Sequence, residues 1–271
     1  YPRWVKTSVH TRPISIKQLL ANLDFNLENG VDQFSESPQI LIAGCGTGQN
    51  SIVTASRFKN SHVTAIDLSL SSLSYAKRKT IEYGITNIEY IQADILNLKS
   101  LGKQFDIVES VGVLHHMKDP MSGWRTLVDC LKPGGLMKIG LYGEVGRKHI
   151  VKAIDIIHNL KIDKSPKEML VFREFIKTSK DPTLTRLHDE ADFYSTSNCR
   201  DLIFHVQEHR FTAPQLYKCI EALNLVFLGF EYPNNNEKEH GQKSCPDWMR
   251  GINRSYSDEL DFPRQAFWLQ K

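Results

Sequence analysis

Short apolar runs alternate with amphipathic stretches through the first half of the chain. The runs are rich in β-branched residues and end in polar or glycine-containing turns, which is typical of buried strands. The predicted strands are 39–43, 62–66, 88–92, 105–110 and 136–142, and the predicted helices between them are 50–59, 70–83 and 97–102. Strands that alternate with helices predict an α/β fold, with a parallel sheet covered by helices on both faces.

The clearest helix boundary lies at Asp119. Its carboxylate is suited to cap a helix, and Pro120 occupies the first helical turn. The sequence Lys-Pro-Gly-Gly at 132–135 predicts a turn that ends this helix after Leu131.

The alternation breaks after residue 142. Helices rich in charge are predicted at 150–160, 166–177 and 198–210. They carry too few apolar residues for a core of their own, so we expect a lid resting on the carboxyl edge of the sheet. The remaining predicted elements are an N-terminal helix at 14–23, a helix at 213–223 and strands at 225–230 and 265–269.

Composition excludes several classes of protein. The 271 residues are 41% hydrophobic and 24% charged, with a net charge of +3, which is ordinary for a soluble globular protein. No basic run exceeds Lys77–Lys79, so nucleic acid is not indicated. Five scattered cysteines without a C-x-x-C pair indicate neither a disulfide framework nor a thiolate metal site. No signal peptide or membrane span is apparent, and we expect a cytoplasmic protein.

A glycine loop follows the first predicted strand. Gly44, Gly46 and Gly48 form G-x-G-x-G, and Gln49 stands where a dinucleotide-binding loop would need its next glycine. Glycines allow a sharp turn that brings backbone N–H groups against a ligand. The spacing favours a ligand without a pyrophosphate, namely S-adenosylmethionine, although the loop alone also fits a plain strand-to-helix turn.

Acidic residues end the following strands. Asp67 lies about 20 residues after the loop, the distance typical of a carboxylate that binds a ribose. Asp94 follows the next strand, where it suits the exocyclic amine of adenine, and Glu109 follows the fourth. Because parallel strands end at one edge, these groups are expected to converge there.

With these motifs, residues Gln39 to Tyr142 resemble a class I S-adenosylmethionine-dependent methyltransferase. The resemblance implies a Rossmann-like, doubly wound, mostly parallel seven-stranded sheet with an antiparallel last strand. It implies that the three loop glycines bind the methionine part, Asp67 the ribose, and Asp94 with the Ile95 backbone the adenine. The full set of cofactor residues expected is Ala43, Gly44, Cys45, Gly46, Gly48, Asp67, Leu68, Asp94, Ile95 and Glu109.

One position departs from the family pattern. The family commonly has an acidic residue two positions before the first glycine, whereas this chain has Ile42. The backbone carbonyls of Ala43 or Glu109 would then bind the ammonium of the cofactor. The departure favours one alternative, a binding module without catalysis, while the glycine spacing disfavours a second, a nicotinamide oxidoreductase.

Histidines follow the fourth strand at the same edge. Methyl transfer to an alcohol or ammonium requires removal of a proton, and His115 or His116 could accept it, with His115 preferred. The alternative is that one histidine is packed and the other is exposed, and that neither is catalytic. Tyr142 and Trp4 could wall the transfer site, or belong to the core. Cys45 is better explained as a small packing residue than as a nucleophile.

The sequence His205-Val206-Gln207-Glu208-His209 matches H-x-x-E-H, which on a helix could bind zinc. No third ligand is obvious, so we expect no metal. We expect His205, His209 and Arg210 to contact the acceptor instead, with a surface ion pair as the alternative for Arg210.

The predicted divisions are a helical segment at 1–38, the cofactor-binding half at 39–142, the lid insertion at 143–212 and the end of the sheet at 213–271. The acceptor is expected to be a small molecule or a peptide. The Y-P-R-W start and the A-G-C-G-T-G loop are similar to methyltransferase domains that follow tetratricopeptide repeats, so a preceding region is expected, although this chain shows no such repeat.

Overall fold

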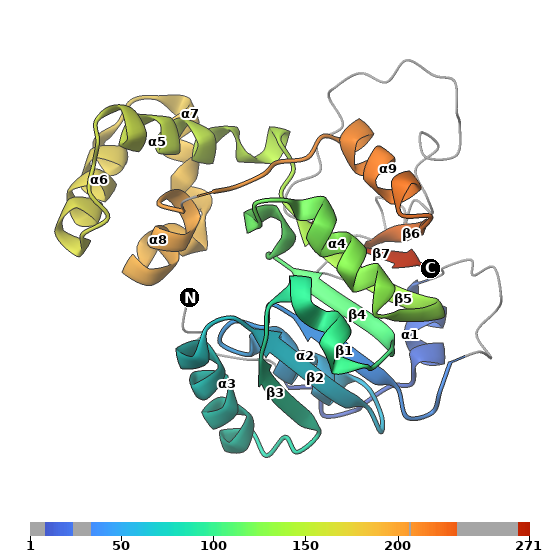
Figure 1. The fold of residues 1–271 in the computed structure, drawn as a ribbon. Helices are drawn as coiled ribbons and strands as arrows, with labels where there is room; N and C mark the ends of the chain where they lie inside the picture. The colour runs from blue at the N-terminus through green and yellow to red at the C-terminus, as the bar shows by residue number, and fades with distance from the viewer. Residues whose placement is uncertain (1–8, 24–33, 206, 232–264) are drawn as a thin grey trace.

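The computed structural model describes residues 9–23, 34–205, 207–231 and 265–271, and its centre is a sheet (Figure 1). The strands of this seven-stranded sheet follow the order β3-β2-β1-β4-β5-β7-β6. They are β1 (Gln39–Ala43), β2 (His62–Asp67), β3 (Ile88–Gln92), β4 (Phe105–Val111), β5 (Leu131–Leu141), β6 (Val226–Glu231) and β7 (Gln265–Gln270). Strands β1 to β5 pair in parallel, and β7 is antiparallel to both β5 and β6. The predicted Rossmann-like sheet with its antiparallel last strand is therefore confirmed.

Helices cover both faces because alternate residues of each strand point to opposite sides. Ile42 and Ile107 lie in an apolar cluster with residues of α1 (Ile16–Leu23), α2 (Gln49–Arg57) and α3 (Leu70–Glu82). Leu41 and Val108 lie in a second cluster with α4 (Pro120–Asp129), α9 (Ala213–Ala222) and the 3-10 helix η1 (Ile95–Leu101). The sheet is thus doubly wound.

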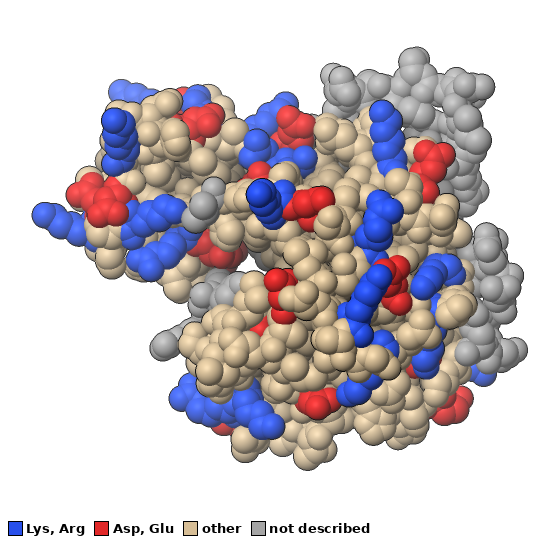
Figure 2. All heavy atoms as spheres, viewed as in Figure 1, with Lys and Arg blue, Asp and Glu red and all other residues tan. Residues whose placement is uncertain are grey.

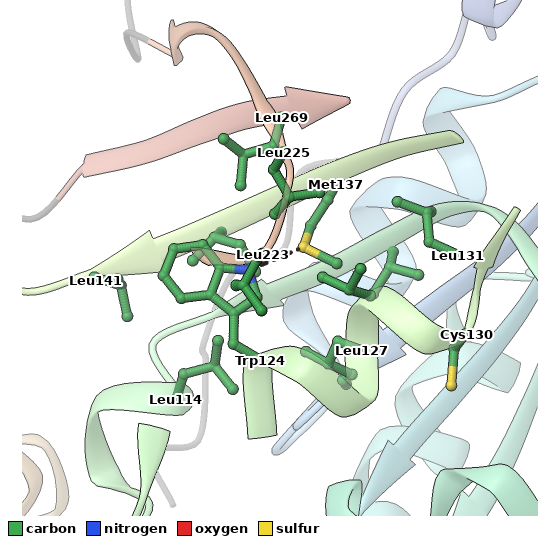
Figure 3. Packing of buried hydrophobic residues seen from close by; sticks show 14 of the residues in the cluster. Leu114, Trp124, Leu127, Cys130, Leu131, Met137, Leu141, Leu223, Leu225 and Leu269 are labelled. Carbon is green, nitrogen blue, oxygen red and sulfur yellow. Dashed lines mark hydrogen bonds between the residues drawn. The ribbon is translucent and has the colours of Figure 1, made fainter. Parts of the chain in front are cut away.

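Trp124 on α4 anchors the second cluster (Figure 3). Its indole is completely buried, and its Nε1–H donates to the sulfur of Met137 on β5 at 3.2 Å. Leu114, Leu127 and Leu269 belong to the same apolar cluster (Figure 3). A tryptophan side chain buries more apolar surface than most other side chains, so Trp124 contributes strongly to the stability of this core.

The boundaries of α4 and β5 differ from the prediction at one end. Asp119 caps α4 as predicted, accepting from the N–H groups of Met121 and Ser122 at 3.0 and 3.2 Å. The helix ends at Asp129, however, and the predicted turn at 132–135 is part of β5. Gly134 N–H donates to the Lys271 carbonyl at 3.0 Å, and a register shift between Phe105 and Ile107 accommodates the change.

The insertion at 143–212 forms a separate helical cluster beside the carboxyl ends of the strands (Figure 1). Its elements are η3 (Val145–Arg147), α5 (Lys148–Asn159), α6 (Pro166–Thr178), α7 (Pro182–Thr185), η4 (Arg186–Asp189), η5 (Ala191–Tyr194) and α8 (Thr196–Ile203). The prediction that it lacks a core of its own was wrong. Its buried apolar residues are Ile150, Ala153, Ile157, Met169, Phe172, Ile176, Leu184, Leu187, Phe193, Cys199, Leu202, Ile203 and Phe204.

Charges of both signs are interspersed over the insertion and the sheet unit on the face shown in Figure 2. Among the described residues, none of the helices combines the length and the apolar character needed to cross a membrane.

Candidate active site

The glycine loop connects β1 to α2 in a conformation that requires glycine. Gly44, Gly46 and Gly48 have φ values of +78°, +52° and +91°. A Cβ on Gly44 would lie 2.4 Å from a methyl of Val113, and a Cβ on Gly48 would lie 2.6 Å from the Cβ of Ala76. Both contacts are too short, so the loop can pack against its neighbours only without side chains at these positions.

The N–H groups of the loop are used within the protein. Those of Gly44 and Cys45 both donate to the Ile66 carbonyl at 2.9 Å, and that of Gly48 donates to the Cys45 carbonyl at 3.0 Å. The N–H of Gly46 donates to Asp67 Oδ2 at 2.8 Å. The expectation that N–H groups of this loop face a ligand is therefore not met for these four residues, and the loop offers a ligand mainly a close approach to its backbone.

Asp67 at the end of β2 holds this loop in place. Its side chain is buried, and Oδ1 accepts from the Ser69 N–H at 2.8 Å while Oδ2 accepts from Gly46. A carboxylate oxygen can accept two hydrogen bonds, so each oxygen retains one lone-pair site. The geometry is compatible with a bound diol, and it adds a bracing role that the sequence did not reveal.

Asp94 lies at the end of the neighbouring strand β3, where it caps η1 by accepting from the Leu96 N–H at 3.0 Å. Ile95 is buried beneath it. Leu68 and Leu96 expose 64% and 49% of their surface beside the two carboxylates. Apolar side chains next to acceptor groups match the two needs of a nucleoside, a flat apolar ring and polar edges.

Cys45 is buried within the loop. Burial, with a smaller contribution from the charge of Asp67, raises the pKa of its thiol to about 12. The side chain is therefore a neutral thiol at physiological pH, which argues against a nucleophilic role because the thiolate is the reactive form.

The two candidate histidines lie in the 3-10 helix η2 (Leu114–His116), directly after the Val113 that contacts Gly44. His115 is completely buried, and its ring centre is 3.8 Å from that of Tyr142. His116 is partly exposed and stacks on His205 at 3.7 Å. The structure thus brings His115, His116, Tyr142 and His205 together beside the glycine loop, whereas Trp4 lies outside the described residues.

The segment after α8 returns to the sheet across these histidines. His209 N–H donates to the His115 carbonyl at 2.7 Å, and the Gln207 carbonyl lies 3.0 Å from His116 Nδ1. The segment is not helical, so the prediction of a helix to residue 210 was wrong and His205 and His209 do not lie one helical turn apart. In the described part of the chain, no group of three side chains suits a metal ion.

A buried ion pair links the two ends of the insertion. Arg147 binds Glu208 through two contacts, Nε to Oε1 at 2.9 Å and Nη2 to Oε2 at 2.6 Å. The Arg147 guanidinium also lies 3.6 Å above the Tyr142 ring. Arg210 approaches the same carboxylate at 3.8 Å, which agrees with the ion-pair alternative for this residue. No pattern in the sequence pointed to Arg147.

Comparisons with known proteins place this site in a family. Residues 40–135 match the sequence profile of a methyltransferase domain. A ubiquinone biosynthesis O-methyltransferase of Pseudomonas fluorescens is 30% identical over 152 residues, which are 52% of this chain and 60% of that protein. Residues 40–135 therefore form a methyltransferase domain, and the sheet that contains them has the fold of the class I S-adenosylmethionine-dependent methyltransferases. S-adenosylmethionine is accordingly the cofactor of this domain.

Two further relatives cover more of the methyltransferase. An uncharacterized protein of Synechococcus is 33% identical over 203 residues, 71% of this chain and 48% of that protein. The solved structure of PKMT2 from Rickettsia typhi in complex with AdoHcy has a TM-score of 0.67 at 18% identity, covering 99% of this chain and 54% of that one. The chain thus spans about half the length of these two relatives, and the PKMT2 likeness shows the fold.

Proposed function

We propose that this methyltransferase moves a methyl group from S-adenosylmethionine to an oxygen or nitrogen of a small molecule or peptide. The observation that carries the proposal is the position of His116, a partly exposed histidine in the short 3-10 helix after Val113, which packs at the glycine loop. The likeness to an O-methyltransferase supports an oxygen acceptor, and a histidine base serves oxygen and nitrogen equally well.

The hydrogen bond to Gln207 determines which ring nitrogen of His116 can act as a base. A carbonyl can only accept, so Nδ1 carries the proton and Nε2 keeps its lone pair. Burial is the largest influence on His116 and lowers its pKa below that of an exposed histidine. The ring is therefore neutral near pH 7 and able to accept a proton. His115, the residue preferred from the sequence, is completely buried, so we assign it a packing role against Tyr142.

We propose that residues at the ends of different strands contact different parts of the cofactor. S-adenosylmethionine supplies an electrophilic methyl group on its sulfonium. The loop at 44–48 would face its methionine part, the free lone pairs of Asp67 its ribose hydroxyls, and Asp94 with Leu68 its adenine. His205, His209 and Arg210 would contact the acceptor from the returning segment.

The test measures conversion of S-adenosylmethionine to S-adenosylhomocysteine with panels of alcohol and amine acceptors. His116→Asn should lower kcat by roughly 10²–10⁴-fold with unchanged cofactor affinity, because a general base contributes that much. His115→Asn should act mainly on stability. Cofactor binding without turnover on any acceptor would instead identify a binding module, and unchanged kcat in His116→Asn would remove the histidine from the mechanism.

A further inference from the structure

The chain has no acidic side chain at position 42. An acidic residue is common two positions before the first glycine in this family, yet Ile42 is buried in an apolar cluster. The cofactor carries an ammonium on its methionine part, and a buried ammonium needs a carboxylate or several acceptors beside it.

Glu109 lies directly beside Ile42 on the neighbouring strand. The two residues are paired in the parallel register of β1 and β4, so their side chains point to the same face of the sheet. Adjacent strands are about 4.8 Å apart, a distance that a glutamate side chain spans. A carboxylate on β4 can therefore serve the region that a carboxylate at position 42 would serve.

A neighbouring hydroxyl orients this carboxylate inside the protein. Glu109 is 3% exposed, and its Oε2 accepts from the hydroxyl of Thr54 on α2 at 3.0 Å. Since α2 begins at the end of the glycine loop, the carboxylate lies on the loop's side of the sheet, near its carboxyl edge. A buried carboxylate with an apolar neighbour on one side is a strong acceptor for a cation.

The backbone carbonyls expected from the sequence are less suited to the ammonium. The Ala43 carbonyl accepts from the hydroxyl of Ser110 at 3.2 Å, and its remaining lone pair carries no net charge to match the ammonium. Glu109 pairs with Ile42 on one side and Lys138 on the other, so its backbone belongs to the interior of the sheet.

We propose that the side-chain carboxylate of Glu109 binds the ammonium of the cofactor's methionine part and replaces the acidic residue missing at Ile42. The proposal rests on the proposed function, because it concerns the same cofactor site. Thr54 acts as a positioning residue that orients the carboxylate through its hydroxyl.

The experiment compares two probes by calorimetry. S-adenosylhomocysteine carries the amino-acid part, and 5′-methylthioadenosine lacks it. Glu109→Gln should raise the Kd of S-adenosylhomocysteine about 10- to 100-fold, because a hydrogen bond to a charged group is lost, and change the Kd of methylthioadenosine less than about threefold. Asp106→Asn is the matched control, a buried carboxylate at the opposite end of β4 that binds Lys132, and should leave both constants unchanged.

A double variant that restores an acidic residue at position 42 tests the same proposal by rescue. Ile42→Asp combined with Glu109→Gln should recover at least part of the lost affinity for S-adenosylhomocysteine. If Glu109→Gln does not fold, Glu109→Asp is the second variant, because it keeps the carboxylate but shortens the side chain by one methylene. It should also weaken the binding of S-adenosylhomocysteine selectively.

Equal weakening of both probes, or of neither, would overturn the proposal by giving Glu109 a structural role alone. If the unmodified protein binds neither probe, the cofactor site of the proposed function fails as well, which is a different result from selective failure at Glu109.

Discussion

The cofactor-binding half and the insertion achieve burial in different ways. At 39–142, each strand supplies residues to both faces, and the helices on each face complete two continuous apolar clusters. The insertion instead packs short helices around Phe172 and Phe193, in a cluster separate from those of the sheet. The site proposed above therefore lies at a junction of two cores, with the proposed cofactor residues on one and part of the proposed acceptor region on the other.

Removal of one large buried side chain from each core tests whether they are independent. Trp124→Ala and Phe193→Ala each remove a completely buried ring and should cost about 3–5 kcal/mol of unfolding free energy, as large core truncations do. Phe193→Ala should speed hydrogen exchange in α5, α6 and α8 while the strands and S-adenosylhomocysteine binding stay unchanged. Equal loss of protection in β1 and β4 would show that the two cores unfold as one.

The bracing role of Asp67 predicts an effect confined to the cofactor half. Asp67→Ala removes acceptors from the Gly46 and Ser69 N–H groups and from the proposed ribose contact, so S-adenosylhomocysteine binding should weaken by about 1–3 kcal/mol. Calorimetry measures this change. Asp94→Ala is the comparison, because it removes one N-cap bond of η1 and should leave the glycine loop intact. An unchanged affinity in Asp67→Ala would contradict the ribose assignment.

The two regions also differ in how readily their sequences predict them. The limits of β3 and the cap at Asp119 follow from local signals, and both are confirmed. The residues of the turn expected at 132–135 are counted within β5, but they lie between its pairings of Leu131 and Leu136 with β4. Gly134 has a φ of +73°, so the local preference of Pro and Gly persists inside the strand. Arg147 and Glu208 are 61 residues apart, so no local pattern could connect them. Local rules place the glycine loop, but they reveal neither its brace at Asp67 nor the junction.

The pH dependence should report His116 at that junction. Because its pKa is lowered in the folded protein, His116 stays neutral at pH 6.5 and loses its base function as pH falls through the lowered pKa. Stability follows the same sign, since between the lowered pKa and about 6.5 the unfolded chain binds more protons, and the free energy of unfolding decreases as pH falls. A pH–rate profile and NMR titration of the ring measure both, and His116→Asn should remove the acid limb. A ring that titrates above pH 6.5 would contradict this assignment.

Helix caps give the smallest predicted effects, one in each region. Ser69 accepts from the Ser72 N–H at 3.2 Å at the start of α3, and Ser165 accepts from the Glu168 N–H at 3.3 Å at the start of α6. Replacing either serine with Ala should cost about 1 kcal/mol in urea denaturation, while Asp at the same position retains the cap. If Ser165→Ala also weakens S-adenosylhomocysteine binding, the two regions are coupled more tightly than their separate cores indicate.

The two ends of the insertion meet at one place on the sheet unit. Gly143 and Phe211 form a parallel bridge, the Phe211 N–H donates to the Tyr142 carbonyl at 2.9 Å, and the Arg147–Glu208 pair joins the chain just beyond them. In terms of chain connectivity, the insertion therefore leaves the sheet unit and returns to it at the same place. No strand of the described sheet lies within 143–212, so a different insertion at this junction would leave the order and direction of the strands unchanged.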